Sequence, residues 1–391
     1  MIAKEYEPFS LVEGQEFKTF LAMLNPGYQL PSRKTLSTVH IPQMYNKVHE
    51  QVKNELTGIS SICLTTDGWT SLSNQSYIAL TANFIHTNGA LRARLLDCFA
   101  WQNRHTAENI AAELRRVVVE WEIQEKVCAV VSDNAANITA AIRLLGWKHF
   151  PCFAHTLNLI VQAGVKEISE VQTKVKNIVT FLKHSAHGTA KLETIQQQMG
   201  LDPVKLKQDV VTRWHCTYDM FTRMLYVRDA VLSAIVILEA DLHPLVSTEW
   251  TILEKACEIL KPFKEVTEEM SSEKNVTISK VILLANGLMQ HIDEVEKDDL
   301  PRQCRNMAKA MKAQVKRRFD NIEGNSMLAE ATVFDPRFKQ YGFSKRASYE
   351  ASYRSISHHV SRVETAHCNP EEEETPRSVP AQKPRLRCGS R

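Results

Sequence analysis

Two short apolar runs in this chain each lead into an aspartate: ICLTTDGW at residues 62–69 and VCAVVSDN at residues 127–134. A short apolar run bounded by polar residues is typical of a buried strand in an α/β sheet. The runs therefore predict two strands, Ile59 to Asp67 and Val127 to Asp133, and each strand ends on a carboxylate. If the strands are parallel neighbours, the two carboxylates could hold a divalent ion, and such sites cut or join phosphodiesters.

The residues between the two runs predict how the strands are ordered. Alternating apolar residues predict a strand from Ser76 to His86, and Asn88-Gly89 predicts a tight turn into a return strand from Leu91 to Phe99. Thr106 can cap a helix that runs to about Glu122. Such a helix allows the last strand to lie parallel beside the first, by the usual right-handed connection. This is the strand order of a ribonuclease-H-like core.

Length and composition limit the class of protein. A chain of 391 residues is expected to form two or three domains, and each can bury a core. The net charge is only +3, so any DNA contact must come from a local basic patch. The sequence contains no apolar run long enough for a transmembrane helix and no secretory signal, so no membrane association is expected. The absence of a secretory signal points to the cytosol or the nucleus. The nine cysteines form no C-x-x-C pair, and in a reducing compartment most would be buried small apolar residues or free surface thiols.

The order of apolar patterns predicts an α/β fold with a ribonuclease-H-like core, interrupted by a large all-helical insertion and preceded by a helical leader. The last stretch is polar, with an acidic run and several prolines, and it predicts a disordered tail. The expected segments are a leader (1–57), the first part of the core (58–165), the helical insertion (166–320), a return to the core (321–345) and the tail (346–391).

Four motifs stand in a fixed order along the chain: TDGWTS at 66–71, SDNAANI at 132–138, CFAHTLNL at 152–159 and TRW at 212–214. Together they resemble the hAT transposases, and most closely the domesticated zinc-finger BED-type proteins. Pro31-Ser32-Arg33 and the stretch FDPRFK at 334–339 also match the pattern. The resemblance covers roughly residues 5 to 345 and implies a nuclear, DNA-associated protein.

The resemblance implies a role for several residues. Asp67 and Asp133 match the first two acids of the family's Asp-Asp-Glu metal site, which would take Mg²⁺ or Mn²⁺ in an active enzyme. His155, with Cys152, matches the C-x-x-H element beside that site. The residues also have plainer readings: aspartate after a strand often forms a turn or a helix cap. Cys152 and His155 could instead be zinc ligands, although no second pair with zinc spacing follows.

Two further features predict contacts with DNA. Arg213 and Trp214 match the family's Arg-Trp pair, which supports flipped or hairpinned DNA ends, and base stacking on a Trp contributes about 1–3 kcal/mol. The alternative is that Trp214 belongs to the core. Between Pro301 and Phe319, one helix face carries basic residues that could follow a phosphate backbone or could simply be solvated. These residues are Arg302, Arg305, Lys309, Lys312 and Lys316.

The sequence also departs from the family pattern. It contains no Ser-Glu-Arg motif, whose glutamate is the third catalytic acid, and no paired ligands of a BED zinc finger. Glu330 and Asp335 are the only acids near a plausible late strand, and neither fits that motif. The expected function is therefore a catalytically inactive, nuclear, DNA-associated or transcription-regulatory interaction module with vestigial Asp67 and Asp133 and no cofactor.

Other readings stay open at this point. The chain could be an active metal-dependent nuclease or transposase with Glu330 or Asp335 as the third ligand. It could also be a truncated gene product without a settled function. Protein partners and the formation of homo-oligomers are left open, because the family's dimer rests on a C-terminal region that this sequence does not contain.

Overall fold

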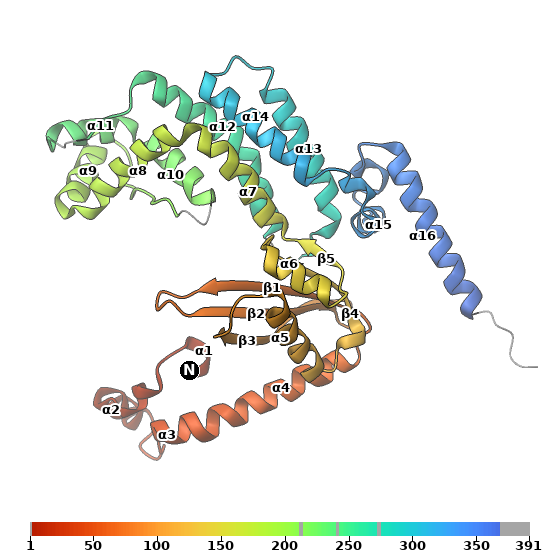
Figure 1. Ribbon diagram of the computed structural model, residues 1–391. Coiled ribbons are helices and arrows are strands. Elements are labelled where there is room, and N and C mark those ends of the chain that lie inside the picture. Colours follow the sequence, from red (N-terminus) through yellow and green to blue (C-terminus); the bar gives the residue numbers. More distant parts are fainter. Residues whose placement is uncertain (1, 211–213, 240–241, 272–274, 368–391) are drawn as a thin grey trace, which may run out of the picture. The chain divides into compact units, whose positions relative to one another are not determined.

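The computed structural model describes residues 2–210, 214–239, 242–271 and 275–367 (Figure 1). Two compact units result, Met1–Thr277 with Leu288–Arg318 and Ile278–Gly287 with Phe319–Arg391. The first unit begins with the leader helices α1 (Ile2–Glu5), α2 (Gln15–Leu24), α3 (Arg33–Thr35) and α4 (Ile41–Thr57). The predicted second leader helix, Ile41 to Leu56, is confirmed as α4.

A mixed sheet with two helices follows the leader. Its strands are β1 (Ile62–Thr70), β2 (Ser76–Ile85), β3 (Leu91–Trp101), β4 (Val127–Ser132) and β5 (His149–Pro151). Helix α5 (Ala107–Glu120) joins β3 to β4, and α6 (Ala136–Leu144) joins β4 to β5. The sheet order is β3-β2-β1-β4-β5, with β1 antiparallel to β2 and parallel to β4. The predicted ribonuclease-H-like order of the first four strands is therefore confirmed.

Local signals in the sequence account for the connections within the sheet. Gly89 has a φ of 81°, which a glycine adopts without strain, and it closes the turn between β2 and β3. The Thr106 side chain accepts a hydrogen bond from the backbone N–H of Asn109, so it caps α5 as predicted. The crossover through α5 then returns the chain beside β1.

The first strand is longer than the sequence predicted. The expectation that it ends at Asp67 is wrong, because β1 continues to Thr70. Its parallel pairing with β4 stops at Thr65 and Val131, whereas its antiparallel pairing with β2 continues to Thr70 and Ser76. The hairpin partner therefore extends the strand past the point where the apolar run stops.

One face of the sheet forms the main core. Leu64 of β1 and Leu80 of β2 are fully buried, as is Val117 of α5, and α5 and α6 cover this face (Figure 1). The leader packs on this core through Leu56 and is also attached to the sheet by charge, since the Glu55 carboxylate at the end of α4 accepts hydrogen bonds from Arg92 and Arg94 of β3.

Eight α-helices lie between the sheet and residue 320 within the described residues, and all but the first fall in the region that was predicted to be helical (166–320). They are α7 (Phe153–Val165), α8 (Ser169–His184), α9 (Ala186–Gln198), α10 (Trp214–Tyr226), α11 (Arg228–Ile237), α12 (Ser247–Met270), α13 (Val281–Val295) and α14 (Arg302–Arg318). Helix α7 packs closely on α14, because Gly164 leaves room for the side chains of Met307 and Met311. A buried carboxylate, Asp209, accepts hydrogen bonds from Lys176 (2.6 Å) and Thr217 (2.7 Å).

The second unit differs from expectation at two places. The region around Glu330 does not form a strand: residues Ser326–Phe334 form helix α15, capped by the Asn325 side chain. The tail is not disordered from residue 346, because Arg346–His367 form helix α16; residues 368–391 lie outside the described part. Apolar side chains in α16 recur at helical spacing from Tyr349, and the Tyr349 ring packs on Phe343 with ring centroids 5.9 Å apart.

A buried carboxylate joins the segments of the second unit. Glu323 is 7% exposed, and it accepts hydrogen bonds from Ser344 (2.6 Å), Lys345 and Asn286. Burial by itself raises the pKa of this carboxyl, but the hydrogen bonds, those of Ser344 first, hold its pKa below the usual range. The ionised form is therefore the one that the fold stabilises.

Glu323→Gln is expected to lower the free energy of unfolding at pH 7 by about 1–3 kcal/mol, because it weakens several hydrogen bonds to a charged acceptor. A lowered folded-state pKa stabilises the fold above the unfolded pKa, near 4.5, and this contribution is lost as the pH falls through the folded pKa. The gap between the two proteins in urea unfolding should therefore shrink below about pH 4.5. The exposed Glu350→Gln is the control, with an expected change within about 0.5 kcal/mol. An equal gap for Glu323→Gln at pH 7 and pH 3 would contradict the assignment.

Candidate functional site

The two aspartates that ended the apolar runs occupy matching positions on neighbouring strands. Thr65 of β1 pairs with Val131 of β4, and Asp67 and Asp133 each lie two residues farther along the chain. Parallel neighbours in a sheet are about 4.8 Å apart. The structure thus brings the two acids to one rim of the sheet, Asp67 within β1 and Asp133 directly after β4.

The hydrogen bonds of the two carboxylates differ. Asp67 is exposed, and its Oδ1 accepts a hydrogen bond from the adjacent Gly68 N–H (2.9 Å). Asp133 is half-buried, and its Oδ1 accepts from the N–H of Ala135 (3.1 Å), which fixes the turn before α6. Asp133 therefore stabilises the turn before α6 and also lies at the rim of the sheet.

A histidine that the sequence did not single out lies beside Asp133. His149 of β5 places Nε2 2.9 Å from the buried Ser132 Oγ. Burial lowers the pKa of the His149 imidazole, and the nearby Asp133 carboxylate opposes this effect without overcoming it. The strand β5 has only three residues, too few for a periodic signal, so nothing in the pattern marked His149.

The C-x-x-H element is joined to the same rim. The backbone N–H of Cys152, the residue before α7, donates to the Ser132 carbonyl (2.7 Å). Asn134 Nδ2 donates to Thr156 Oγ1 (3.2 Å), one residue after His155 in the first turn of α7. His155 itself is half-buried. The second and third sequence motifs therefore form one hydrogen-bonded corner between β4 and α7.

The donor set at this rim does not complete a metal centre. Within the described ranges, no three His, Cys, Asp or Glu side chains gather closely enough to hold a metal ion. Mg²⁺ takes six oxygen ligands and is held by carboxylates with waters and substrate phosphates, and structural Zn²⁺ takes four protein ligands. The residues present therefore fit neither a complete Mg²⁺ or Mn²⁺ site nor a structural zinc site.

The two acids considered as a third ligand belong to the second unit. Glu330 is half-buried within α15. Asp335, at the end of α15, accepts hydrogen bonds from the Arg337 guanidinium (2.7 and 2.9 Å) and from Ser279 Oγ (2.7 Å). The bonds from Arg337, above all, hold the pKa of the Asp335 carboxyl well below its usual range. The Asp335 carboxylate thus has a structural role within its own unit.

The predicted Arg-Trp pair is described only in part, because Arg213 lies outside the described residues. Trp214 begins α10 and is 2% exposed. Its backbone N–H donates to Asn158 Oδ1 of α7 (3.2 Å), whereas its buried indole Nε1 has no hydrogen-bond partner in the described part of the chain. In this conformation the indole is covered, and contact with a displaced base would require neighbouring helices to move.

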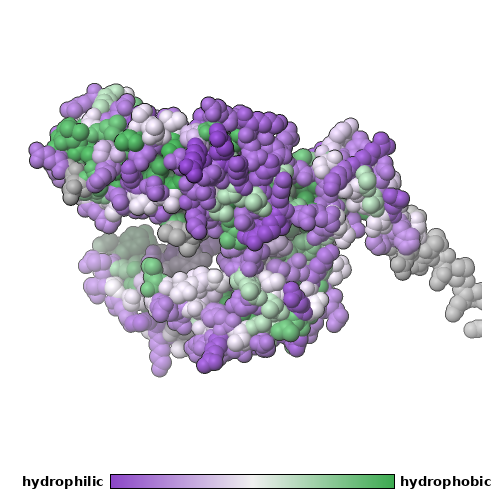
Figure 2. Space-filling model, turned by 45° about the horizontal axis from the view of Figure 1, so that its top comes forward, coloured by the Kyte–Doolittle hydropathy of each residue, from purple (hydrophilic) through white to green (hydrophobic). Residues whose placement is uncertain are grey.

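The five basic residues of α14 that the sequence placed on one face fall into two groups. Lys312 is engaged by Asp293 (2.8 Å) and Glu296, and Arg305 lies 3.7 Å from Asp299. The other three, Arg302, Lys309 and Lys316, are exposed and make no ion pair with any residue in the described ranges. Cys304, Met307, Ala308, Met311 and Val315 form the buried face of the same helix. Figure 2 shows a largely hydrophilic surface over helices α12 to α14.

Comparison with known proteins matches two family models to this chain. The ZBED1 RNase-like domain matches residues 65–150, and the ZBED1 RNase-like helical domain matches residues 150–259. These ranges contain the sheet rim with both aspartates and the helices from α7 into α12. The domain boundary at residue 150 falls within β5, where the chain leaves the sheet for α7.

Curated relatives extend over most of the chain. A Zea mays protein named as an AC transposase is 28% identical over 366 residues, which is 87% of this chain and 44% of that protein. Zinc finger BED domain-containing protein 4 of Homo sapiens is 27% identical over 361 residues, or 88% of this chain and 30% of the relative. Zinc finger BED domain-containing protein 6 of Homo sapiens is 27% identical over 364 residues, or 87% and 37%. The chain thus spans less than half the length of these relatives. No helix in the described part is long and apolar enough to cross a membrane.

Proposed function

Because this chain is derived from the hAT transposases and related to the zinc-finger BED domain-containing proteins, we propose that it is a nuclear protein that associates with DNA without cutting it. One observation carries the proposal: the parallel register of β1 and β4 leads Asp67 and Asp133 to the same rim of the sheet, but no third acid joins them within the described residues of the first unit. Two carboxylates alone bind Mg²⁺ weakly, because the ion otherwise keeps its waters and depends on substrate phosphates for further ligands. The rim would thus keep two acids of a metal-dependent active site without the full set of metal ligands.

The α14 face supports the DNA-binding part of the proposal. Arg302, Lys309 and Lys316 are seven residues apart, so they lie on one side of the helix at intervals of about 10.5 Å. Their charges are not neutralised by carboxylates in the described part, whereas Lys312 is engaged by two acids. Free cations in a row release counterions when they meet a phosphate backbone.

Replacing Arg302, Lys309 and Lys316 together by alanine is expected to weaken binding to duplex DNA and to reduce the salt slope, d log K/d log[salt], by about 2–3. Each lost phosphate contact removes about 0.9 from that slope. Fluorescence anisotropy with a labelled 20-base-pair duplex at several salt concentrations measures both effects.

The matched control for this experiment is Lys312→Ala. It removes one positive charge from the same helix, but from a lysine that Asp293 and Glu296 already hold. The control should change the salt slope by much less than 0.9. An unchanged slope in the triple variant, or an equal effect per charge in the control, would contradict a role for this face in DNA binding.

The proposal also covers the domain architecture of the chain and its location in the cell. We infer that the helices from α7 to α14 are an insertion into the ribonuclease-H-like core, to which residues 321–345 return. Chemical cross-links from Lys339 or Lys345 to lysines of the sheet region support this insertion, and their absence under conditions that cross-link the rest of the chain opposes it. Nuclear location is tested with a fluorescently tagged chain, and exclusion from the nucleus would contradict it.

The alternative function is a metal-dependent DNA nuclease. The observation that favours it is the same register of Asp67 and Asp133, since neighbouring strand ends are where such enzymes place their acids. This reading requires a further ligand to reach the rim. A cleavage assay on DNA in Mg²⁺ or Mn²⁺ separates the nuclease from the proposal.

A further inference from the structure

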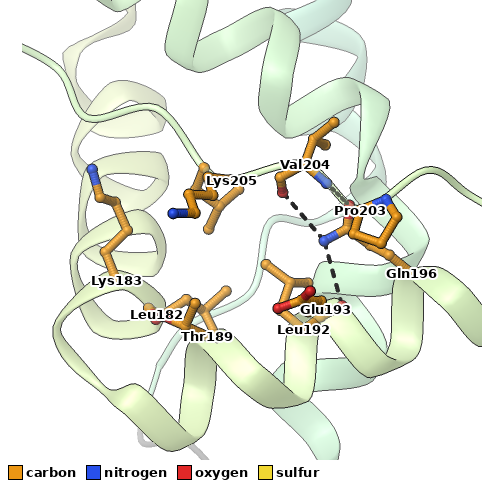
Figure 3. Close-up of a pocket in the computed structure, with 10 residues that line it drawn as sticks. Leu182, Lys183, Thr189, Leu192, Glu193, Gln196, Pro203, Val204 and Lys205 are labelled. Carbon is orange, nitrogen blue, oxygen red and sulfur yellow. Dashed lines mark hydrogen bonds between the residues drawn. The ribbon is translucent and has the colours of Figure 1, made fainter.

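A cavity of about 310 Å³ lies in the helical region (Figure 3), and none of its lining residues comes from the sheet or from α14. It lies between the end of α8, one side of α9 and the extended segment Pro203–Leu206. The volume is at the low end of ligand pockets, and is suited to one or two side chains rather than to a large cofactor.

The floor of the cavity is apolar and its polar groups are already bonded. Leu182, Leu192 and Leu206 line it and are each 6% exposed or less. The buried Gln196 side-chain amide makes two hydrogen bonds with the main chain of Val204. Its Nε2 donates to the Val204 carbonyl (3.3 Å), and its Oε1 accepts from the Val204 N–H (3.0 Å). Figure 3 shows these bonds along the wall of the cavity. The floor therefore offers apolar contact and no free polar group.

The mouth of the cavity carries two lysine side chains that have no ion-pair partner in the described part of the chain. Lys183 of α8 and Lys205 of the extended segment are exposed, and neither ammonium makes an ion pair with any residue in the described ranges. Nearby lysines differ, since Lys207 pairs with Asp219 (3.0 Å) and Lys176 with Asp209 (2.6 Å). One acid, Glu193 of α9, also lines the cavity.

We propose that this cavity binds a peptide segment of a partner protein in which a leucine-like side chain is flanked by acidic residues. The apolar side chain occupies the floor, and its neighbouring carboxylates meet Lys183 and Lys205. Charge complementarity to two unpaired ammonium groups selects an acidic segment. Nucleic acid fits less well, because the floor has no donor or acceptor for a base.

The test uses a fluorescein-labelled peptide of twelve alternating leucine and aspartate residues, with anisotropy as the readout on the full chain. The expected result is saturable binding that weakens at least tenfold in the double variant Lys183→Ala/Lys205→Ala. Lys18→Ala/Lys47→Ala removes the same charge from the exposed surface of α2 and α4 and should leave peptide binding unchanged. Glu193→Gln should tighten binding several-fold, a gain that misfolding cannot imitate.

Two altered peptides and one single-stranded oligonucleotide show which chemical feature of the ligand causes binding. A peptide with asparagine in place of aspartate, and one with serine in place of leucine, should each bind at least tenfold more weakly. Equal binding of the serine peptide would show attraction by charge alone and overturn the proposal. Tighter binding of a single-stranded oligonucleotide that depends on Lys183 and Lys205 would also overturn it. Neither outcome bears on DNA binding through α14, which the salt-slope experiment tests separately.

Discussion

Trp214→Ala is expected to lower the free energy of unfolding of the first unit by about 3–5 kcal/mol. The indole is 2% exposed at the start of α10, so its removal leaves a large cavity among packed helices. The backbone N–H of the same residue is bonded to Asn158 of α7, which holds the helix start in place and limits relaxation into the cavity. Urea unfolding followed by far-ultraviolet circular dichroism measures the loss.

Trp69 provides the matched control for the Trp214 substitution. Trp69 is 45% exposed and stacks on Tyr77 with ring centroids 5.7 Å apart, so Trp69→Ala should cost roughly 1 kcal/mol or less. If Trp214→Ala were equally mild while DNA binding fell sharply, the indole would be a DNA contact and the buried conformation would not be the one that matters in solution.

Gly164→Val is expected to lower the free energy of unfolding by about 2–3 kcal/mol. A Cβ atom at this position would lie 2.4 Å from Met311 Cγ and 2.7 Å from its sulfur, where α7 packs on α14. The branched side chain therefore forces the two helices apart. Gly164→Ala should cost less, since the gain of about 1 kcal/mol in helix propensity offsets part of the strain.

A double-mutant cycle identifies the cause of the Gly164 effect. Met311→Ala by itself should cost about 2–5 kcal/mol, but in the Gly164→Val background it should cost much less, because the valine fills the vacated space. Gly287→Ala is the matched control: Gly287 lies within α13 with no atom near its absent Cβ, so alanine there should stabilise by about 0.5–1 kcal/mol. Additive effects of Gly164→Val and Met311→Ala would contradict the contact.

The first four strands of the sheet were predictable from the sequence because their signals are local, whereas β5 was not predicted. The apolar runs before Asp67 and Asp133 mark two strands, Asn88-Gly89 marks the hairpin, and Thr106 marks the start of the crossover helix. The end of β1 was not predictable in this way, since residues after Asp67 are held by pairing with β2 rather than by an apolar pattern. Likewise, helix α16 was missed because its polar composition outweighs a sparse apolar spacing.

The candidate site was predictable only in outline. The positions of Asp67 and Asp133 follow from strand order, and the structure brings them into register. His149 escaped notice because a three-residue strand has no periodicity, although its imidazole lies against Ser132. The burial of Trp214 was not predictable from its own motif, and its backbone N–H bonds to Asn158 of α7, more than fifty residues earlier. Packing between segments that are distant in the sequence cannot be predicted from a local motif.

The central claim, a DNA-associated chain that does not cut DNA, is tested most directly by a cleavage assay. The purified chain is incubated with linear and hairpin DNA in Mg²⁺ and in Mn²⁺, beside the Asp67→Asn and Asp133→Asn variants. The proposal predicts no cleavage above buffer for any of the three proteins, with DNA binding retained. Reproducible cleavage by the unaltered chain that either substitution abolishes would contradict it and establish the nuclease.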